Sequence, residues 1–276
     1  MLHIATLSSG AASAYTAQLM IDEVGRDNCQ AIFTDTLVED ADNYRFLDEI
    51  VAHLGVPYFR LCEGKTPLEL AWTHHALPSD LIPFCSQELK REPMERYIEE
   101  LQDAENIHDI TLWWGIGVEE SHRAVAIGRN WLANYNIHSR FPLIEQTVYH
   151  NRPFEWLEEI GIKRPRMYDE GFQHANCGMQ GCVRGGLNHW ALLYDRRPDV
   201  YAQTEALEQQ WQRDFGKHNT ILRITRDGVK SQISLKDFRE QHLENKPLFN
   251  GDFNQDLFPT EPKNACGCMA QAFEAA

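Results

Sequence analysis

Cysteine is the residue type of this chain best suited to chemistry, and three of the seven cysteines stand in informative settings. Cys177 and Cys182 have four residues between them in a Gly-rich stretch, which would suit one half of a metal site. Cys85 is expected to open a helix that carries Lys90 and Arg91, and a helix N-terminus with nearby cations favours the thiolate. The alternative for Cys85 is packing as a small hydrophobic residue.

Three interpretations of Cys85, Cys177 and Cys182 stay open from their types and spacing: an iron–sulfur cluster, a zinc site, or thiols without a metal. If the metal is zinc, His174 and His189 flank the pair and are candidate fourth ligands. The alternatives for them are a hydrogen-bonded structural histidine and a histidine on a helix surface. Clustered cysteines in a chain without a secretory signal favour metal or redox chemistry over structural disulfides.

Two further cysteines, Cys266 and Cys268, lie near the C-terminus. The stretch from residue 250 onward is polar and interrupted by prolines, so we expect it to be mobile. Thiols on a mobile tail can swing into a cleft, and an incidental role is the alternative. Cys29 and Cys62 are expected at strand edges and are assigned no role.

A candidate anion-binding turn stands at the start of the chain. The apolar run 2–7 predicts a strand, the pattern over 14–24 predicts a helix, and small residues join the two. Such a turn presents backbone N–H groups at a helix N-terminus, where a phosphate or sulfate can bind. The candidate residues are Ser8, Ser9, Gly10 and Ser13. The turn has neither the Walker A nor the Rossmann pattern, and an ordinary strand-to-helix turn is the alternative.

More candidate ligand-binding residues follow two other predicted strands. Thr34, Asp35 and Thr36 end the strand at 30–33, where a carboxylate can meet a ribose or adenine donor; an N-cap role is the alternative for Asp35. Gly115 and Gly117 follow the strand at 109–114 and suit close approach of a flat ligand to the backbone.

A short helix with an arginine is expected just beyond these glycines. Arg123 can clamp a phosphate or sulfonate with two hydrogen bonds. Alternatively, it forms an ion pair with Glu119 or Glu120.

These residues require an α/β scaffold. The β-α-β-α-β order of the first 61 residues predicts a doubly wound, mainly parallel sheet with right-handed crossovers. Expected strands are 2–7, 30–33, 56–61 and 109–114, with helices at 14–24 and 42–54 and an extended piece at 140–144. Further helices are expected at 151–161, 187–194 and 200–215, and a small C-terminal appendage holds a hairpin at 220–235. His74 and His75 are expected on a surface or in a loop.

Composition narrows the class of protein. The 276 residues carry 43% hydrophobic residues and a formal net charge of -15. The negative charge makes nucleic acid an unexpected partner, because phosphate contacts need Lys and Arg. There is neither a signal-peptide pattern nor an apolar run long enough for a membrane span, so we expect a cytoplasmic protein without membrane contact.

Together, in order over residues 1–190, these motifs resemble the phosphoadenosine-phosphosulfate reductase family of the adenine nucleotide alpha-hydrolase-like (PP-loop) superfamily. The motifs are the turn at 8–13, the segment 33–36 with 44–46, Cys85 with Leu89, Lys90 and Pro93, the segment 115–117 with Glu120 and Arg123, the segment 141–143, and Gly171-Phe172 leading to Cys177 and Cys182.

The resemblance implies an adenine nucleotide, ATP or an adenylyl sulfate, across the carboxyl edge of the sheet. It implies phosphate or sulfate at Ser8–Ser13, the nucleoside near Asp35 and Gly115, and an anionic group at Arg123. In relatives, cysteines placed like Cys85, Cys177 and Cys182 hold a [4Fe–4S] cluster. The implied domains are 1–195 (nucleotide-binding, with the cysteine loop), 196–249 (helical and hairpin appendage) and 250–276 (mobile tail with cysteines).

The chain departs from the family pattern at informative positions. Ser9 replaces the first glycine and Ala12 the aspartate of the Ser-Gly-Gly-x-Asp-Ser loop of the pyrophosphatases, which puts ATP cleavage in doubt. Phe84-Cys85 stands where reductases with a cluster have a Cys-Cys pair, and the gap between Cys177 and Cys182 is four residues instead of two.

Three functions follow from the resemblance. The first is a sulfonucleotide reductase-like enzyme, in which Cys266 or Cys268 attacks the sulfur and a thioredoxin-like donor or the neighbouring cysteine resolves the product. The second is an ATP-dependent sulfurtransferase with an iron–sulfur cluster. The third is a non-catalytic nucleotide-binding or interaction protein. A homodimer is one possible assembly.

Overall fold

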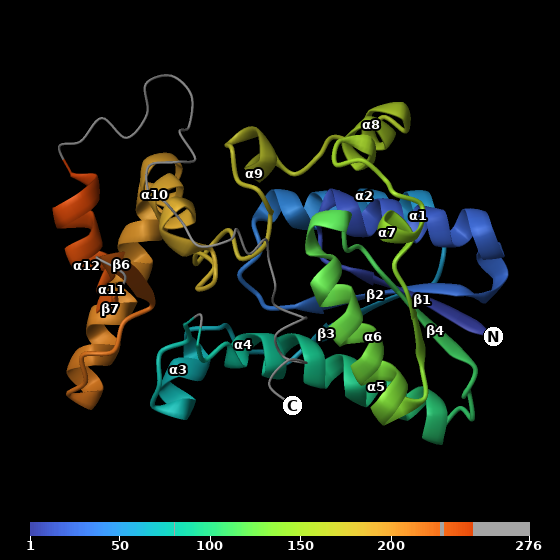
Figure 1. Ribbon diagram of the computed structural model, residues 1–276, viewed down its shortest axis with the longest axis horizontal. Helices are drawn as coiled ribbons and strands as arrows, with labels where there is room; N and C mark the ends of the chain where they lie inside the picture. The colour runs from blue at the N-terminus through green and yellow to red at the C-terminus, as the bar shows by residue number, and fades with distance from the viewer. Residues whose placement is uncertain (80, 227–228, 245–276) are drawn as a thin grey trace.

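A five-stranded parallel sheet lies between two helical layers (Figure 1). The computed structural model describes residues 1–79, 81–226 and 229–244. The sheet order is β3-β2-β1-β4-β5, and all four pairings are parallel. The strands are β1 (Leu2–Leu7), β2 (Cys29–Asp35), β3 (Tyr58–Cys62), β4 (Ile110–Trp114) and β5 (His138–Arg140). The predicted doubly wound α/β fold is confirmed.

The two faces of the sheet bury alternate residues of the strands, as the period of two along a strand requires. Leu7, Phe33 and Trp113 pack with α1 (Ala11–Val24), α2 (Ala41–Leu54) and α8 (Arg152–Glu159) on one face. Ile4 and Leu112 pack on the other face with α5 (Glu92–Asp103) and α6 (Ser121–Tyr135). Helices therefore cover both faces of the strands that form the site.

The strand order reverses between β1 and β4. From β1 the chain runs outward through β2 to β3, and it then returns to place β4 on the opposite side of β1. At such a reversal the loops after the two central strands diverge and leave a crevice at their carboxyl ends, which is where open α/β sheets bind ligands.

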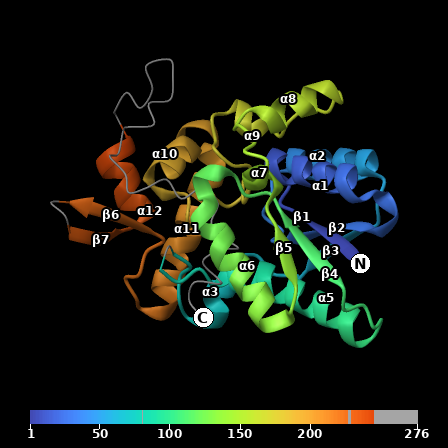
Figure 2. The same ribbon diagram turned by 45° about the vertical axis from the view of Figure 1, so that its right-hand side comes forward.

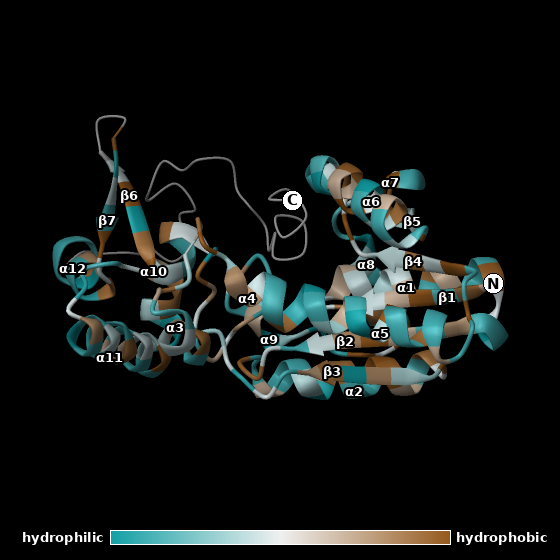
Figure 3. Cartoon of the chain, turned by 90° about the horizontal axis from the view of Figure 1, so that it is seen from below, coloured by the Kyte–Doolittle hydropathy of each residue, from teal (hydrophilic) through white to brown (hydrophobic). Residues whose placement is uncertain are grey.

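The later part of the chain forms a second apolar cluster beside the sheet domain. It joins α10 (Gly186–Arg196), α11 (Pro198–Phe215) and the predicted hairpin, β6 (Leu222–Arg226) and β7 (Val229–Ile233). Figures 1 and 2 show the hairpin at the end of the molecule away from the N-terminus. The predicted boundary at residue 195 falls in the last turn of α10, and Trp190 of α10 meets Tyr201 of α11 edge to face. Figure 3 shows the sheet domain and the hairpin from below, coloured by hydropathy.

Several local expectations differ from the structure. Only His138–Arg140 is extended, and 142–145 forms helix α7 (Pro142–Glu145), because Pro142 occupies a first-turn position that proline favours. His74 and His75 are exposed, as expected; His74 ends helix α3 (Glu69–His74), and His75 adopts the left-handed conformation after it. The short helix expected around Arg123 extends to Tyr135 as α6.

The remaining elements are short. They are η1 (Arg26–Asn28), α4 (Phe84–Ser86), η2 (Gln87–Arg91), η3 (Val118–Glu120), α9 (Arg166–Asp169), α12 (Leu235–Phe238) and η4 (Arg239–Leu243). Among the helices that the structure describes, none combines the length and apolar character that crossing a membrane requires.

A buried carboxylate joins α11 to the hairpin. Glu208 is fully buried and accepts hydrogen bonds from the backbone N–H groups of Ile221 at 2.8 Å and Leu235 at 2.6 Å. Burial raises the pKa of Glu208 to about 7, although the two N–H donors act in the opposite direction. Because its folded-state pKa lies above the unfolded one, the folded protein binds the proton more tightly.

We therefore expect stability to fall as the pH rises from about 4.3, the ordinary pKa of glutamate, to about 7, by on the order of 3 kcal/mol from this group. Glu208→Gln should flatten this part of the profile, measured as urea unfolding free energy against pH. The exposed Glu158→Gln should leave the profile unchanged. A Glu208→Gln profile as steep as that of the parent would contradict the assignment.

The end of β4 and the first turn of α1 approach so closely that only glycine fits at position 115. A Cβ there would lie 2.6 Å from the Ser13 Cα and 2.7 Å from the Ser13 nitrogen, both backbone atoms. We expect Gly115→Ala to lower the unfolding free energy by about 1–3 kcal/mol, measured by urea denaturation, because α1 must move.

Gly128→Ala is the matched control for this prediction. Gly128 lies inside α6, and its added Cβ would stand 3.6 Å from the Phe141 ring, an ordinary contact. This variant should be neutral or up to about 1 kcal/mol more stable, from helix propensity. Equal stability of the Gly115→Ala variant and the parent would show that the close approach is not a constraint.

Candidate functional site: a pocket at the strand reversal

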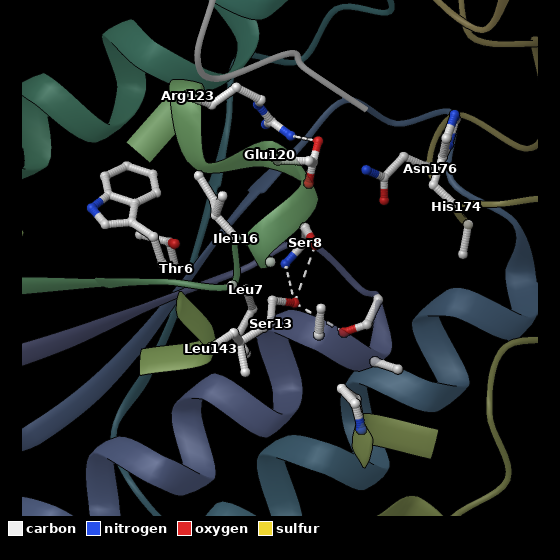
Figure 4. Close-up of a pocket in the computed structure, with 18 of the residues that line it drawn as sticks. Thr6, Leu7, Ser8, Ser13, Ile116, Glu120, Arg123, Leu143, His174 and Asn176 are labelled. Carbon is white, nitrogen blue, oxygen red and sulfur yellow. Dashed lines mark hydrogen bonds and ion pairs between the residues drawn. The ribbon is translucent and has the colours of Figure 1, made fainter. Parts of the chain in front are cut away.

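A pocket opens at the carboxyl edge of the sheet, where β1 and β4 diverge. The turn after β1, the loop after β4 and the first turn of α1 line it on one side. Figure 4 shows Ser8 and Ser13 at its base, Arg123 and Glu120 on one wall, and Asn176 and His174 across from Ser8.

The turn after β1 is held by its own serines. The Ser8 N–H and hydroxyl donate to the Ser13 Oγ at 3.0 and 3.1 Å, and the Ser13 hydroxyl lies 3.0 Å from the Gly10 carbonyl oxygen, which accepts from it. Gly10 is the N-cap of α1, and because glycine has no side chain, no side-chain hydrogen bond caps this end of the helix. The first amide groups of a fourteen-residue helix therefore border the pocket at the positive end of its dipole.

Two buried cationic side chains add positive charge to the pocket beside the N-terminus of α1. Lys90 and Arg123 are 7% and 9% exposed, and both line the pocket. Arg123 forms an ion pair with Glu120, which is the alternative predicted for it. Lys90 lies on the π-helical turn η2, which re-aims side chains within a helix and is often found at functional sites.

The structure brings together most of the residues predicted to bind the nucleotide. The lining includes Ser8, Gly10, Ser13, Thr34, Gly115, Gly117 and Arg123. Ser9, Asp35 and Thr36 lie outside the set of described residues that line the pocket.

The contacts of Asp35 stabilise the fold. Its carboxylate is fully buried and accepts from the Leu37 N–H at 2.7 Å and the Tyr44 hydroxyl at 2.8 Å, and it forms an ion pair with Arg60. The alternative prediction, an N-cap role, is wrong, because the N-cap of α2 is Asp40. Asp35 therefore ties β2 to α2 and β3.

Ser9 and Thr36 belong to a buried network that holds the cysteine loop. The Thr36 hydroxyl lies 3.2 Å from Glu39, whose carboxylate accepts from the Cys177 N–H at 2.8 Å. The Asn43 amide bonds the Ala175 carbonyl and approaches the Ser9 Oγ at 3.4 Å. These residues position the loop before Cys177 against the pocket.

A second anchor of the loop is an ion cluster around the buried side chains of Asp40 and Arg197. Arg197 pairs with Asp40 and Glu170 and donates to the Gly178 carbonyl at 3.2 Å, while Arg166 pairs with Asp40 at 2.8 Å. Burial alone would raise the pKa of Asp40, but hydrogen bonds from Arg166, the Asp42 N–H and Arg197 lower it below its usual range. The cluster thus locks the cysteine loop to the start of α2.

The predicted metal set is divided between two apolar clusters. Cys85 packs with Leu89 and Phe172, whereas Cys177 and Cys182 pack with Val38. Within residues 1–79, 81–226 and 229–244, no three His, Cys, Asp or Glu side chains are arranged to hold a metal ion. The residues as placed do not fit a three-cysteine cluster. Cys266 and Cys268 lie outside the described residues.

The two candidate zinc histidines stack on each other. Their rings lie 5.3 Å apart at 12°. The Nε2 atom of His189 accepts from the Cys182 N–H at 3.2 Å, so that lone pair is committed to the backbone. His174 lines the pocket. His189 therefore acts as a structural histidine in this arrangement.

Sequence reasoning missed part of the pocket wall. Tyr168, Gln173 and Asn176 line it, and Lys90 was considered only for its effect on Cys85. The one available signal was that Gln173, His174 and Asn176 directly precede Cys177 in a polar, Gly-rich stretch. Only tertiary packing brings this stretch opposite the turn after β1.

Known proteins that are similar to this chain include one related sequence and several solved structures. No family model matches the chain. An uncharacterized protein of Methanocaldococcus jannaschii is 26% identical over 217 residues, which cover 74% of this chain. The match spans 43% of the length of that relative, so the chain corresponds to less than half of it.

Solved structures that are similar to this one include the following three proteins. Phosphoadenylyl-sulfate reductase of Candida auris, in a phosphate complex, has a TM-score of 0.44 and 17% identity over 63% of this chain and 79% of its own. NH3-dependent NAD synthetase of Campylobacter jejuni has a TM-score of 0.40 and 11% identity, over 79% of this chain and 87% of its own. The U34-tRNA thiolase of Methanococcus maripaludis, with its [4Fe–4S] cluster, has a TM-score of 0.43 and 13% identity, over 79% of this chain and 74% of its own. At these TM-scores, the similarities carry no conclusion about ligand or reaction.

The assignment of Asp35 to the fold can be tested by stability. Asp35→Asn should lower the unfolding free energy by about 1–3 kcal/mol, because it removes the charge from a buried, hydrogen-bonded group. Urea denaturation measures the change. Asp48→Asn, on the exposed face of α2, should stay within about 0.5 kcal/mol of the parent. An Asp35→Asn variant as stable as the parent would indicate that Asp35 has a role other than stabilising the fold.

Proposed function

We propose that this protein binds an adenine nucleotide in the pocket at the strand reversal, with its phosphate or sulfonate at the first turn of α1. The observation that carries the proposal is the position of the pocket between the ends of β1 and β4, where the Ser8–Ser13 turn and the Gly115–Gly117 segment meet. A crevice at this place in a doubly wound sheet is where such folds bind nucleotides.

The charges of the pocket support an anionic ligand. Lys90, Arg123 and the N-terminus of α1 converge on one cavity. Both side chains are buried and line the pocket. A phosphate or sulfonate of the ligand would accept charge-assisted hydrogen bonds from them.

The finer proposal is sulfonucleotide reduction, and it rests on the resemblance of the sequence. The thiolate of Cys266 or Cys268 attacks the sulfur of the bound adenylyl sulfate, an S–S bond forms, and the S–O bond to the nucleotide phosphate breaks. The second thiolate then attacks the sulfur of the cysteine in the S-sulfocysteine and releases sulfite. Two thiols become a disulfide while the sulfonate sulfur gains two electrons, and a thioredoxin-like dithiol restores the thiols.

Calorimetric titration of the full chain with ATP, AMP and adenosine 5′-phosphosulfate tests nucleotide binding. Lys90→Met should weaken binding at least tenfold, about 1.4 kcal/mol, because it removes a cation from the pocket and keeps its length. Lys163→Met, on an exposed segment, is the matched control and should bind like the parent. Absence of binding to all three nucleotides, or equal binding by Lys90→Met, would contradict the proposed site.

Sulfite release from the sulfonucleotide with a dithiol reductant tests the finer proposal separately. The double variant Cys266→Ser with Cys268→Ser should lose sulfite release and keep nucleotide binding. Undiminished release from the double variant would exclude these thiols as nucleophiles. Nucleotide binding by the parent without sulfite release would favour a binding protein over a reductase.

A further inference from the structure

Two cysteines of the buried loop share one packing site. Cys177 and Cys182 are 7% and 3% exposed and form, with Val38, a small cluster of their own. Cys85, the third member of the predicted metal set, belongs to another cluster, with Leu89 and Phe172. Apolar packing thus groups Cys177 with Cys182 and places Cys85 in a different cluster.

The backbone of the loop turns back between the two cysteines. The Cys177 carbonyl accepts from the Gly181 N–H at 2.9 Å and from the Gln180 N–H at 3.3 Å. Gly181 has a φ of +77°, a left-handed conformation that reverses the chain immediately before Cys182. Cys182 therefore returns toward Cys177, and the two cysteines belong to one apolar cluster with Val38.

Separate anchors hold each cysteine in place. The Cys177 N–H donates to buried Glu39 at 2.8 Å, and the next residue but one, Met179, donates its N–H to the Val38 carbonyl at 2.9 Å. The Cys182 N–H donates to His189 at 3.2 Å, and its carbonyl accepts from Trp190 at 3.1 Å. Fixed backbones lower the entropy cost of joining the two side chains.

Cys177 is also held in an uncommon conformation. Its φ is +57°, a region that non-glycine residues rarely occupy. The following Gly178 has no room for a side chain, since a Cβ would lie 2.6 Å from the Met167 sulfur. Strain of this kind persists only where the surrounding structure imposes it.

We propose that Cys177 and Cys182 are a redox-active dithiol that a disulfide oxidant converts into an intramolecular disulfide. A thiolate of the pair attacks one sulfur of the oxidant, R–S–S–R, and expels R–S⁻; the second thiolate attacks the resulting mixed disulfide and expels the other R–S⁻. The pair loses two electrons and two protons, and the oxidant gains two electrons. The bond would form one residue from Asn176, which lines the pocket.

The test uses the full chain with oxidised glutathione as the oxidant, followed by acid quenching, unfolding, alkylation and tryptic mass spectrometry. Both cysteines fall in one peptide, residues 167–184. We expect this peptide to lose two hydrogens, to resist alkylation at both positions, and to recover both thiols with dithiothreitol. Cys85→Ser should behave in the same way, whereas Cys182→Ser should abolish the loss of hydrogens.

Iron and zinc analysis of the purified protein completes the test. The proposal expects no metal whose content depends on Cys177. Iron or zinc that is lost in Cys177→Ser would overturn it in favour of a metal site. Full alkylation of both cysteines after oxidation, or disulfides of Cys177 with cysteines other than Cys182, would overturn it as well. Cys62, which is exposed, should take up glutathione and shows that the oxidant is active.

Discussion

The contact between Gly115 and Ser13 is the constraint on which the candidate site depends. It brings the backbone after β4 against the first turn of α1, with no space for a Cβ. The positive end of the α1 dipole and the loop of the neighbouring strand therefore border one cavity. Lys90, on η2 before α5, and Arg123, in the first turn of α6, reach the same cavity from the face of the sheet opposite to α1.

A second constraint joins the pocket to the cysteine loop. Asp40 and Arg197 form a buried ion pair, and Glu39 and Asn43 bind the loop backbone around Cys177. All three contacts involve residues 39–43 at the start of α2, and one of them also involves Arg197, between α10 and α11. Breaking one partner of such a buried pair is strongly destabilising, so the wall that carries Gln173, His174 and Asn176 is fixed by charge as well as by packing.

Local patterns were enough to predict the sheet, the helices and the turn at Ser8–Ser13, because strand and helix periods are properties of adjacent residues. The partners of Asp35 could not be predicted locally: whether a carboxylate at a strand end faces a ligand or an arginine depends on β3, where Arg60 lies. The position of Lys90 on the pocket wall depends on the π-helical turn, and the clustering of Cys177 with Cys182 depends on the loop turn at Gly181. None of these contacts leaves a periodic signal in the sequence.

A crystal structure of the full chain grown with adenosine 5′-phosphosulfate would show whether the pocket at the strand reversal binds a nucleotide. We expect an anionic group of the ligand within hydrogen-bond distance of the backbone N–H groups of Ala12 and Ser13, with the nucleoside beside Gly115–Gly117. A nucleotide bound elsewhere, or an empty pocket at saturating ligand, would contradict the proposed site.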